Sequence, residues 1–268
     1  MSSLSEAIAL ARSEGRKATG LFVTAGFPDA DSTDAVLDAL VAGGADFIEL
    51  GMPFSDPLAE GPPIQRSSER ALRHGATMSA TLDTALRFRS RHATPLVLMG
   101  YYNPVLQYGL GNFCTDARSS GVDGLIIPDL PPEEAKPLAD AAAANGLDMI
   151  FLIAPNTSDE RVAAIDELSS GFVYAVSVTG VTGGQLSNFE STEAYLSRVS
   201  AVVKKNAVLV GFGIRSHEDA VRLTKHTDGF IVGSALVSLV EELWDAPMSV
   251  SERSSAIAKM VADLRVGH

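Results

Sequence analysis

Short apolar runs alternate with longer stretches in which apolar residues recur at helical spacing. The runs predict strands at residues 20–25, 46–51, 95–101, 122–127, 148–153, 172–177, 207–211 and 229–232. The longer stretches predict helices at 3–14, 32–43, 62–74, 78–91, 109–119, 132–144, 158–168, 190–204, 216–225, 234–243 and 250–264. Ser32 and Ser158 stand where a residue can cap a helix, and Asn145-Gly146 is a typical stop signal.

Strands and helices alternate along the whole chain without a linker or a change in composition. Such alternation predicts the α/β class, with parallel strands joined by right-handed crossovers. Eight units of this kind close into a TIM barrel, here with an extra N-terminal helix, so we expect one domain over residues 1–268. An open doubly wound sheet is the alternative, but no G-x-G-x-x-G motif follows the first strand.

Composition and charge narrow the choice of partners and compartment. Hydrophobic residues make up 46% of the 268 positions and aromatic residues only 6%, which indicates an aliphatic core. The formal charge of −12 and the absence of basic patches argue against nucleic acid or an anionic membrane as a partner. Cys114 is the single cysteine, and the chain shows neither a signal-peptide core nor an apolar run of 18 residues. We therefore expect a cytoplasmic protein without an internal disulfide.

Two carboxylates flank the loop that follows the second predicted strand. Side chains alternate between the faces of a strand, so Ile48 and Leu50 point outward and Glu49 points into the barrel with Phe47. An unpaired acid in such surroundings keeps its proton to higher pH, which suits general acid/base catalysis. Glu60 ends the loop and is the second candidate. The alternatives are a buried ion pair for Glu49 and a solvated charge for Glu60.

Three glycine-bearing turns follow the last three strands and predict a phosphate site. They are Thr182-Gly183-Gly184, Phe212-Gly213 and Gly233-Ser234. Glycine exposes backbone N–H groups to a ligand, and a helix that begins at Ser234 favours an anion at its N-terminus. The alternative is that these are only tight packing turns. Arg215 is the one basic residue beside them, so we expect backbone amides and hydroxyls to hold most of the phosphate.

The remaining residues exclude some chemistries and suggest the shape of the pocket. The six lysines do not end any predicted strand, which argues against a Schiff-base aldolase, and the five histidines lack ligand spacing, so we expect no metal site. Apolar residues at or near strand ends would suit a flat aromatic group, or would merely cap the barrel core. They are Phe22, Tyr101, Ile126, Leu152, Tyr174 and Phe212.

The motifs together resemble those of the tryptophan synthase alpha chain family. The resemblance is carried in chain order by Glu49-Leu50-Gly51-Met52-Pro53-Phe54-Ser55-Asp56-Pro57-Leu58-Ala59-Glu60-Gly61-Pro62, Tyr101-Tyr102-Asn103-Pro104, Ile127-Pro128-Asp129-Leu130-Pro131, Ser177-Val178-Thr179-Gly180-Val181-Thr182-Gly183 and Gly211-Phe212-Gly213-Ile214. It implies a TIM barrel that cleaves indole-3-glycerol phosphate to indole and glyceraldehyde 3-phosphate.

The resemblance also implies roles for single residues. Glu49 would protonate indole C3 and help remove a hydroxyl proton, and Glu60 would accept a hydrogen bond from the indole N–H. The family form best known has Asp at this second position, so we expect the same role with a shifted loop. Segments 53–60 and 178–188 would be mobile lids. Residues implied to contact substrate and phosphate include Thr182, Gly183, Gly213, Gly233 and Ser234.

A partner is implied as well. The family works with a PLP-dependent beta chain in an α2β2 heterotetramer, so this chain would carry no cofactor of its own. The rim that would face the beta chain includes Pro53, Asp56, Pro57, Asp129 and Pro131, although aspartates beside prolines are often only turn formers. Two rival functions are another phosphate-binding barrel enzyme, such as a phosphosugar isomerase, and an inactive subunit that regulates a partner.

Overall fold

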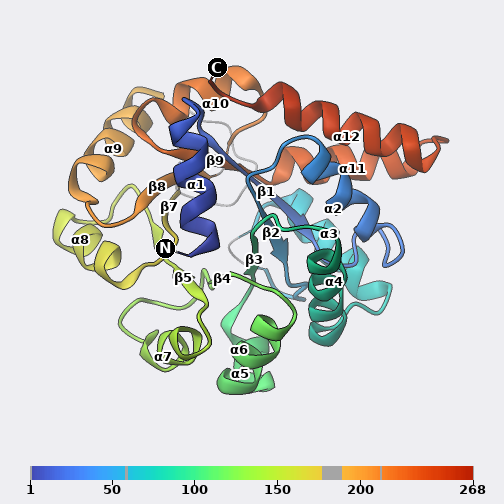
Figure 1. Cartoon of the computed structure of the whole chain (residues 1–268), viewed down its shortest axis with the longest axis horizontal. Helices are drawn as coiled ribbons and strands as arrows, with labels where there is room; N and C mark the ends of the chain where they lie inside the picture. Colours follow the sequence, from blue (N-terminus) through green and yellow to red (C-terminus); the bar gives the residue numbers. More distant parts are fainter. Residues whose placement is uncertain (1, 58–59, 177–188, 212, 268) are drawn as a thin grey trace.

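Parallel strands form the centre of the computed structural model, which describes residues 2–57, 60–176, 189–211 and 213–267. The strands are β1 (Ala18–Thr24), β2 (Phe47–Gly51), β3 (Leu96–Met99), β4 (Gly124–Ile126), β5 (Asp148–Ile150), β6 (Leu152–Ile153), β7 (Phe172–Val176), β8 (Ala207–Gly211) and β9 (Gly229–Val232). Their order in the sheet is β5-β4-β3-β2-β1-β9-β8-β7-β6. Only Phe151 separates β5 from β6, so one strand pairs with β4 through its first half and with β7 through its second. The sheet therefore closes on itself as the predicted TIM barrel (Figure 1).

Helices form the outer layer of the barrel (Figure 1). They are α1 (Ser3–Ser13), α2 (Thr33–Ala42), α3 (Pro62–Arg73), α4 (Met78–Arg91), α5 (Tyr102–Tyr108), α6 (Leu110–Ser119), α7 (Lys136–Ala144), α8 (Asp159–Leu168), α9 (Phe189–Val202), α10 (His217–Leu223), α11 (Ser234–Asp245) and α12 (Val250–Leu264), with a 3-10 turn at Thr224–His226. Within the part of the chain that the structure describes, no helix combines the length and apolar character needed to cross a membrane.

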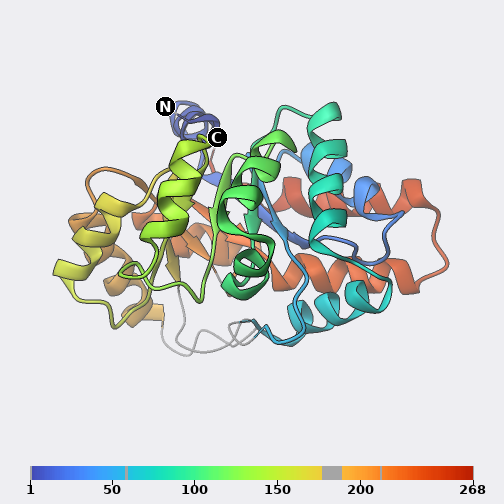
Figure 2. The ribbon, with the colours of Figure 1, turned by 90° about the horizontal axis from the view of Figure 1, so that it is seen from below.

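The extra N-terminal helix α1 closes one end of the barrel. Leu4 is fully buried, and Ser3 Oγ donates a hydrogen bond to Asp123 Oδ1 at 2.6 Å. Because Asp123 immediately precedes β4, α1 covers the end at which the parallel strands begin. Figure 2 shows this helix at the top of the molecule in that view. The opposite end, where the strands finish, is left for the functional loops.

The structure differs from the predicted elements in several places, and three of these differences concern helices. Helix α5 is absent from the predicted elements; its first turn contains Pro104, and proline is tolerated in the first turn of a helix. Helix α7 begins at Lys136 rather than at 132. Ser158 does cap α8, accepting from Arg161 N at 3.4 Å, whereas Ser32 Oγ accepts from Trp244 Nε1 at 2.9 Å.

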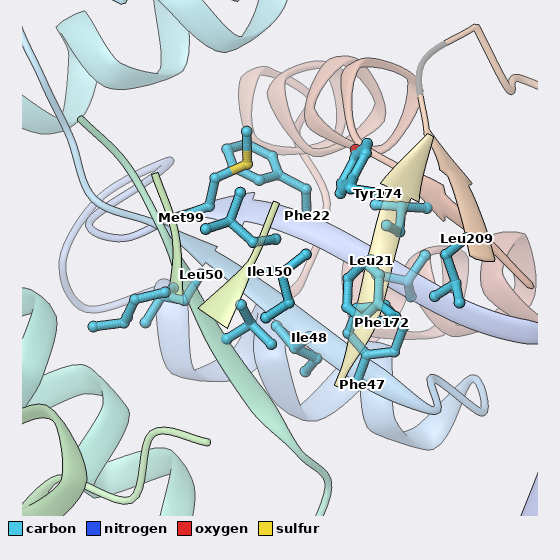
Figure 3. Packing of buried hydrophobic residues seen from close by; sticks show 14 of the residues in the cluster. Leu21, Phe22, Phe47, Ile48, Leu50, Met99, Ile150, Phe172, Tyr174 and Leu209 are labelled. Atoms are coloured by element: carbon cyan, nitrogen blue, oxygen red, sulfur yellow. The ribbon is translucent and has the colours of Figure 1, made fainter. Parts of the chain in front are cut away.

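Glycines on the inner face of the barrel make room for aromatic rings. A Cβ atom on Gly20 would lie 2.2 Å from the ring of Phe47, and one on Gly211 would lie 2.1 Å from the Tyr174 hydroxyl. The Phe47 ring packs on that of Phe172, with centroids 5.4 Å apart. Figure 3 shows these two rings together, with Tyr174 further along the same strand, β7, as Phe172. The rings thus fill the barrel and form an apolar floor under its open end.

Candidate active site

One pocket opens where the strands end, and it collects candidates from distant parts of the sequence. Predicted residues that line it are Phe22, Glu49, Glu60, Tyr174, Gly213, Gly233 and Ser234. They come from β1, β2 and β7 and from the segments that follow β2, β8 and β9. A carboxylate pair and two of the three glycine turns therefore share one pocket at the end of the barrel that the fold predicts.

Glu49 lies in the middle of β2 with its side chain in the pocket. The strand pairs on both sides, placing Glu49 opposite Phe22 of β1 and Val97 of β3. The residue is 1% exposed, and within the described ranges neither carboxylate oxygen has a hydrogen-bond partner. Burial, and secondly the charge of Glu60, raise the pKa of Glu49 to about 8. The alternative of a buried ion pair finds no support among the described residues.

Glu60 is buried rather than solvated. Its side chain lines the pocket, and the residue is 4% exposed. The backbone is held on both sides: Glu60 N donates to Pro57 O at 3.0 Å, and Glu60 O accepts from Gln65 Nε2 of α3 at 2.9 Å. The loop thus carries this acid directly to the start of α3. The two carboxylates also raise the pKa of Tyr174 well above its usual value, although burial of the phenol is the larger cause.

Backbone groups of two glycine turns also line the pocket. Gly233 is the N-cap of α11, whose first turn begins at Ser234, so N–H groups there have no acceptor within the helix. Gly213 adopts a φ of +83°, a left-handed conformation that glycine reaches without strain. A helix N-terminus with free N–H groups attracts anions. Thr182, Gly183 and Phe212 lie outside the described residues, so their part in this site stays a prediction.

The remaining apolar candidates, Tyr101, Ile126 and Leu152, are not among the described residues that line this pocket. The Tyr101 ring stacks on that of Phe54, with centroids 5.1 Å apart, and both line a small hollow that also touches Phe22 and Glu60. Ile126 is fully buried in the barrel, and Leu152 lies beside Tyr174 in the sheet. Neither Ile126 nor Leu152 is among the described residues that line the pocket. This fits the alternative that both side chains belong to the barrel core.

The residues expected to face a partner lie on loops at the same end of the barrel. Asp56 and Pro131 are exposed, and Pro53 and Pro57 are partly exposed. Asp129 is exposed as well and accepts a hydrogen bond from Tyr102 N at 2.9 Å. The loop after β4 is thereby tied to the turn after β3, which the Phe54–Tyr101 stack ties in turn to the loop after β2. Their contact with a partner stays a prediction.

Several residues that line the pocket are not among the predicted site residues. They are Ile64, Met99, Ile214, Arg215, Ile231 and Ala235. Strand alternation could have found Met99 and Ile231, which lie on inner positions near strand ends. Arg215 was visible as the basic residue beside the glycine turns. Among the described residues, no group of three or more His, Cys, Asp or Glu side chains could hold a metal ion.

Comparisons with known proteins point to one family. Residues 8–265 match the family model described as tryptophan synthase alpha chain. The chain is 43% identical to the tryptophan synthase alpha chain of Geobacter sulfurreducens, covering 99% of this chain and 98% of that one. It is 45% identical to the alpha chain of Burkholderia mallei, covering 99% and 96%.

Solved structures are similar throughout their length. The tryptophan synthase subunit alpha of Legionella pneumophila superimposes with a TM-score of 0.89 at 34% identity, over 98% of both chains. A chain of the Mycobacterium tuberculosis tryptophan synthase superimposes with a TM-score of 0.88 at 38% identity, over 99% of both chains.

Proposed function

Because the chain belongs to the tryptophan synthase alpha chain family, we propose that it cleaves indole-3-glycerol phosphate to indole and glyceraldehyde 3-phosphate. Family membership supports a role in tryptophan biosynthesis, and the cleavage is the specific reaction proposed here. The observation that supports this reaction is the burial of Glu49 in the pocket. This buried acid keeps its proton up to a pH of about 8, in the same pocket as the N-terminus of α11.

Glu49 supplies the proton that the reaction needs. At neutral pH most molecules hold Glu49 as the carboxylic acid, which donates to C3 of the indole ring. The ring then becomes an electron acceptor, and the glycerol hydroxyl next to the scissile bond loses its proton to the new carboxylate. The carbon–carbon bond breaks, its electrons return to the ring, and the aldehyde forms. One proton is given and one is taken back, so Glu49 ends as it began.

Glu60 supports the charge that this step creates in the ring. Its carboxylate accepts a hydrogen bond from the indole N–H and stabilises the positive charge that develops when C3 is protonated. Opposite charges within a pocket that excludes water interact more strongly than they would at the surface. The extra methylene relative to aspartate is taken up by the loop, which Pro57 and Gln65 hold close to the start of α3.

The phosphate binds at the side of the pocket that offers backbone groups. Gly213, Gly233 and the first turn of α11 supply N–H donors, and Ser234 adds a hydroxyl. This arrangement leaves the apolar rings of Phe22 and Tyr174 for the flat indole. Binding of the phosphate at one side and the ring at the other would hold the scissile bond beside Glu49.

The proposal is tested by measuring indole release from indole-3-glycerol phosphate with the wild-type chain and Glu49→Gln. We expect kcat to fall by at least about a hundredfold, since an amide cannot donate and recover this proton. Glu134→Gln, an exposed change on the same chain, is the control and should leave kcat unchanged. Binding of glycerol 3-phosphate should survive in Glu49→Gln, which separates lost chemistry from lost folding.

An absence of indole release from the wild-type chain would refute the cleavage reaction. With binding of glycerol 3-phosphate intact, that result would favour a regulatory subunit without chemistry of its own. Unchanged turnover in Glu49→Gln would refute the role of Glu49 as the proton donor.

The name of the family implies a beta chain as partner, and we propose that the chain meets it through the rim around Asp56 and Asp129. These residues lie on loops linked to the pocket through the Phe54–Tyr101 stack and the Tyr102–Asp129 hydrogen bond. A partner that holds these loops would also hold Glu60 in place. Adding a beta chain should therefore raise the rate of indole release, and an unchanged rate would contradict this.

A further inference from the structure

We propose that Arg215 recognises the phosphate of the substrate with its guanidinium group, and that it sets the preference of the site for phosphorylated ligands. The inference rests on the proposed function and adds a side chain to a phosphate site that otherwise consists of backbone amides and a hydroxyl. Arg215 lies in the segment between β8 and α10, two residues after Gly213.

The position of Arg215 is the first reason. It lines the pocket together with Gly213, Gly233 and Ser234, which are the groups expected to hold the phosphate. Arg215 is also exposed, so this residue lies where the pocket meets solvent rather than in the core. Of the described residues that line this pocket, Arg215 is the only basic one.

The backbone that carries Arg215 is fixed by the cap of the next helix. Arg215 N and Ser216 N both donate to Asp219 Oδ2, at 3.0 and 3.2 Å. Ser216 Oγ accepts from Asp219 N at 3.2 Å in return, which completes a capping box at the start of α10. The side chain of Arg215 therefore starts from an ordered turn, and less conformational freedom is lost when it meets a ligand.

Charge is the second reason. The pocket already contains the carboxyls of Glu49 and Glu60, and the whole chain has a formal charge of −12. A phosphate monoester brings up to two negative charges to this place, in addition to the charge of Glu60. Helix N-termini offer only about half a positive charge each. A guanidinium offers a full charge and two parallel N–H donors that match phosphate oxygens.

An arginine at the mouth would act before and after binding. At a distance it would weaken the repulsion between the acidic chain and an anionic substrate, and in the complex it would donate to the phosphate. The affinity of indole, which carries no phosphate, should not depend on it. Arg215 would thus separate phosphorylated from unphosphorylated ligands while leaving the ring end of the pocket unchanged.

The test compares the wild-type chain with Arg215→Ala, Arg215→Lys and a matched control, Arg12→Ala. Arg12 is exposed on α1 at the closed end of the barrel, so the control removes the same charge far from the pocket. For each chain, the dissociation constants of glycerol 3-phosphate and of indole are measured by calorimetry. The KM and kcat for indole-3-glycerol phosphate are measured from indole release at low and high salt.

We expect Arg215→Ala to weaken glycerol 3-phosphate binding and to raise KM on the order of tenfold, with kcat close to wild type. Indole binding should not change, Arg215→Lys should restore part of the loss, and the KM of Arg215→Ala should vary less with salt. Equal affinities for glycerol 3-phosphate in Arg215→Ala and Arg12→Ala would overturn the inference. So would a loss in kcat and in indole binding, which would indicate a structural role. A wild-type chain that releases no indole refutes the proposed reaction, and the glycerol 3-phosphate measurements still decide the role of Arg215.

Discussion

The buried acid Glu49 should make the folded chain lose stability as the pH rises. In the unfolded chain this carboxyl ionises around its ordinary pKa of 4.5, whereas in the folded chain its pKa is about 8. Below 4.5 both states hold the proton and the residue contributes nothing to the pH dependence. Between the two values only the unfolded chain releases it, so unfolding becomes more favourable with each step in pH. Above 8 both states are ionised and the loss is complete.

The size of the effect follows from the difference in pKa. A rise from 4.5 to about 8 spans about 3.5 pH units, and each unit corresponds to about 1.36 kcal/mol. The folded chain should therefore lose at most about 5 kcal/mol from this one group across the window. Such a loss would be a large part of the 5–15 kcal/mol, roughly, that stabilises a typical domain.

Glu49→Gln removes the titration and keeps the shape of the side chain. Unfolding in urea can be followed by the fluorescence of Trp244, the single tryptophan, which is partly buried and donates from Nε1 to Ser32 Oγ. At pH 5, 7 and 9 we compare the free energies of unfolding of the wild-type chain, Glu49→Gln and the exposed control Glu134→Gln. The free energy of unfolding of Glu49→Gln should exceed that of wild type by a margin that grows from pH 5 to pH 9.

A free-energy difference between Glu49→Gln and wild type that is the same at all three pH values would contradict the raised pKa of Glu49. A difference that shrinks as the pH rises would mean that the folded state favours the charged carboxylate. If the free-energy difference between Glu134→Gln and wild type changed with pH by the same amount, the effect would come from the overall charge of the chain rather than from this buried site.

Three further predictions concern the same pocket. Glu60→Gln removes a charge that raises the pKa of Glu49. The alkaline limb of the pH–rate profile should therefore move to lower pH, and kcat should fall about tenfold or more. An unmoved limb would count against the effect of Glu60 on the pKa of Glu49. Gly211→Ala places a Cβ atom 2.1 Å from the Tyr174 hydroxyl and should cost about 1–3 kcal/mol of unfolding free energy in urea titrations, whereas unchanged stability would show that the ring can move. Ser234→Asp suits a helix N-terminus but repels phosphate, so glycerol 3-phosphate binding should be lost at wild-type thermal stability; retained binding would place the anion elsewhere.

The alternation of strands with helices predicted the barrel, and the alternation of side chains along a strand predicted the inward direction of Glu49. Both depend only on which residues follow one another. The period of two put Glu49 on the face of Phe47, and the structure has both inside. Which inward side chains reach the pocket is harder to predict. Ile126 and Tyr174 both lie near strand ends in the sequence, yet only Tyr174 reaches the pocket. The difference depends on strand stagger and ring size, which adjacent residues do not reveal.

Helix α5 is a second case that neighbouring residues alone do not predict. Its first turn contains a proline, and the carboxylate of Asp129, 27 residues away, accepts the N–H of Tyr102 and supports the turn. Arg215 is a comparable case in the site. Its type was visible beside the glycine turns, while its place in the same pocket as Ser234 depends on the closure of the barrel between β8 and β9.

The packing that stabilises the barrel also raises the pKa of the acid in its site. Glycines at positions 20 and 211 leave room inside the barrel for the rings of Phe47 and Tyr174, and the Tyr174 ring lines the same pocket as Glu49. Phe22 stands opposite Glu49 in the neighbouring strand and removes more of its contact with water. The raised pKa therefore follows from core burial, which is favourable for the rings and unfavourable for the carboxylate. A change that opens this floor to water should lower the pKa of Glu49 even when it touches neither carboxyl.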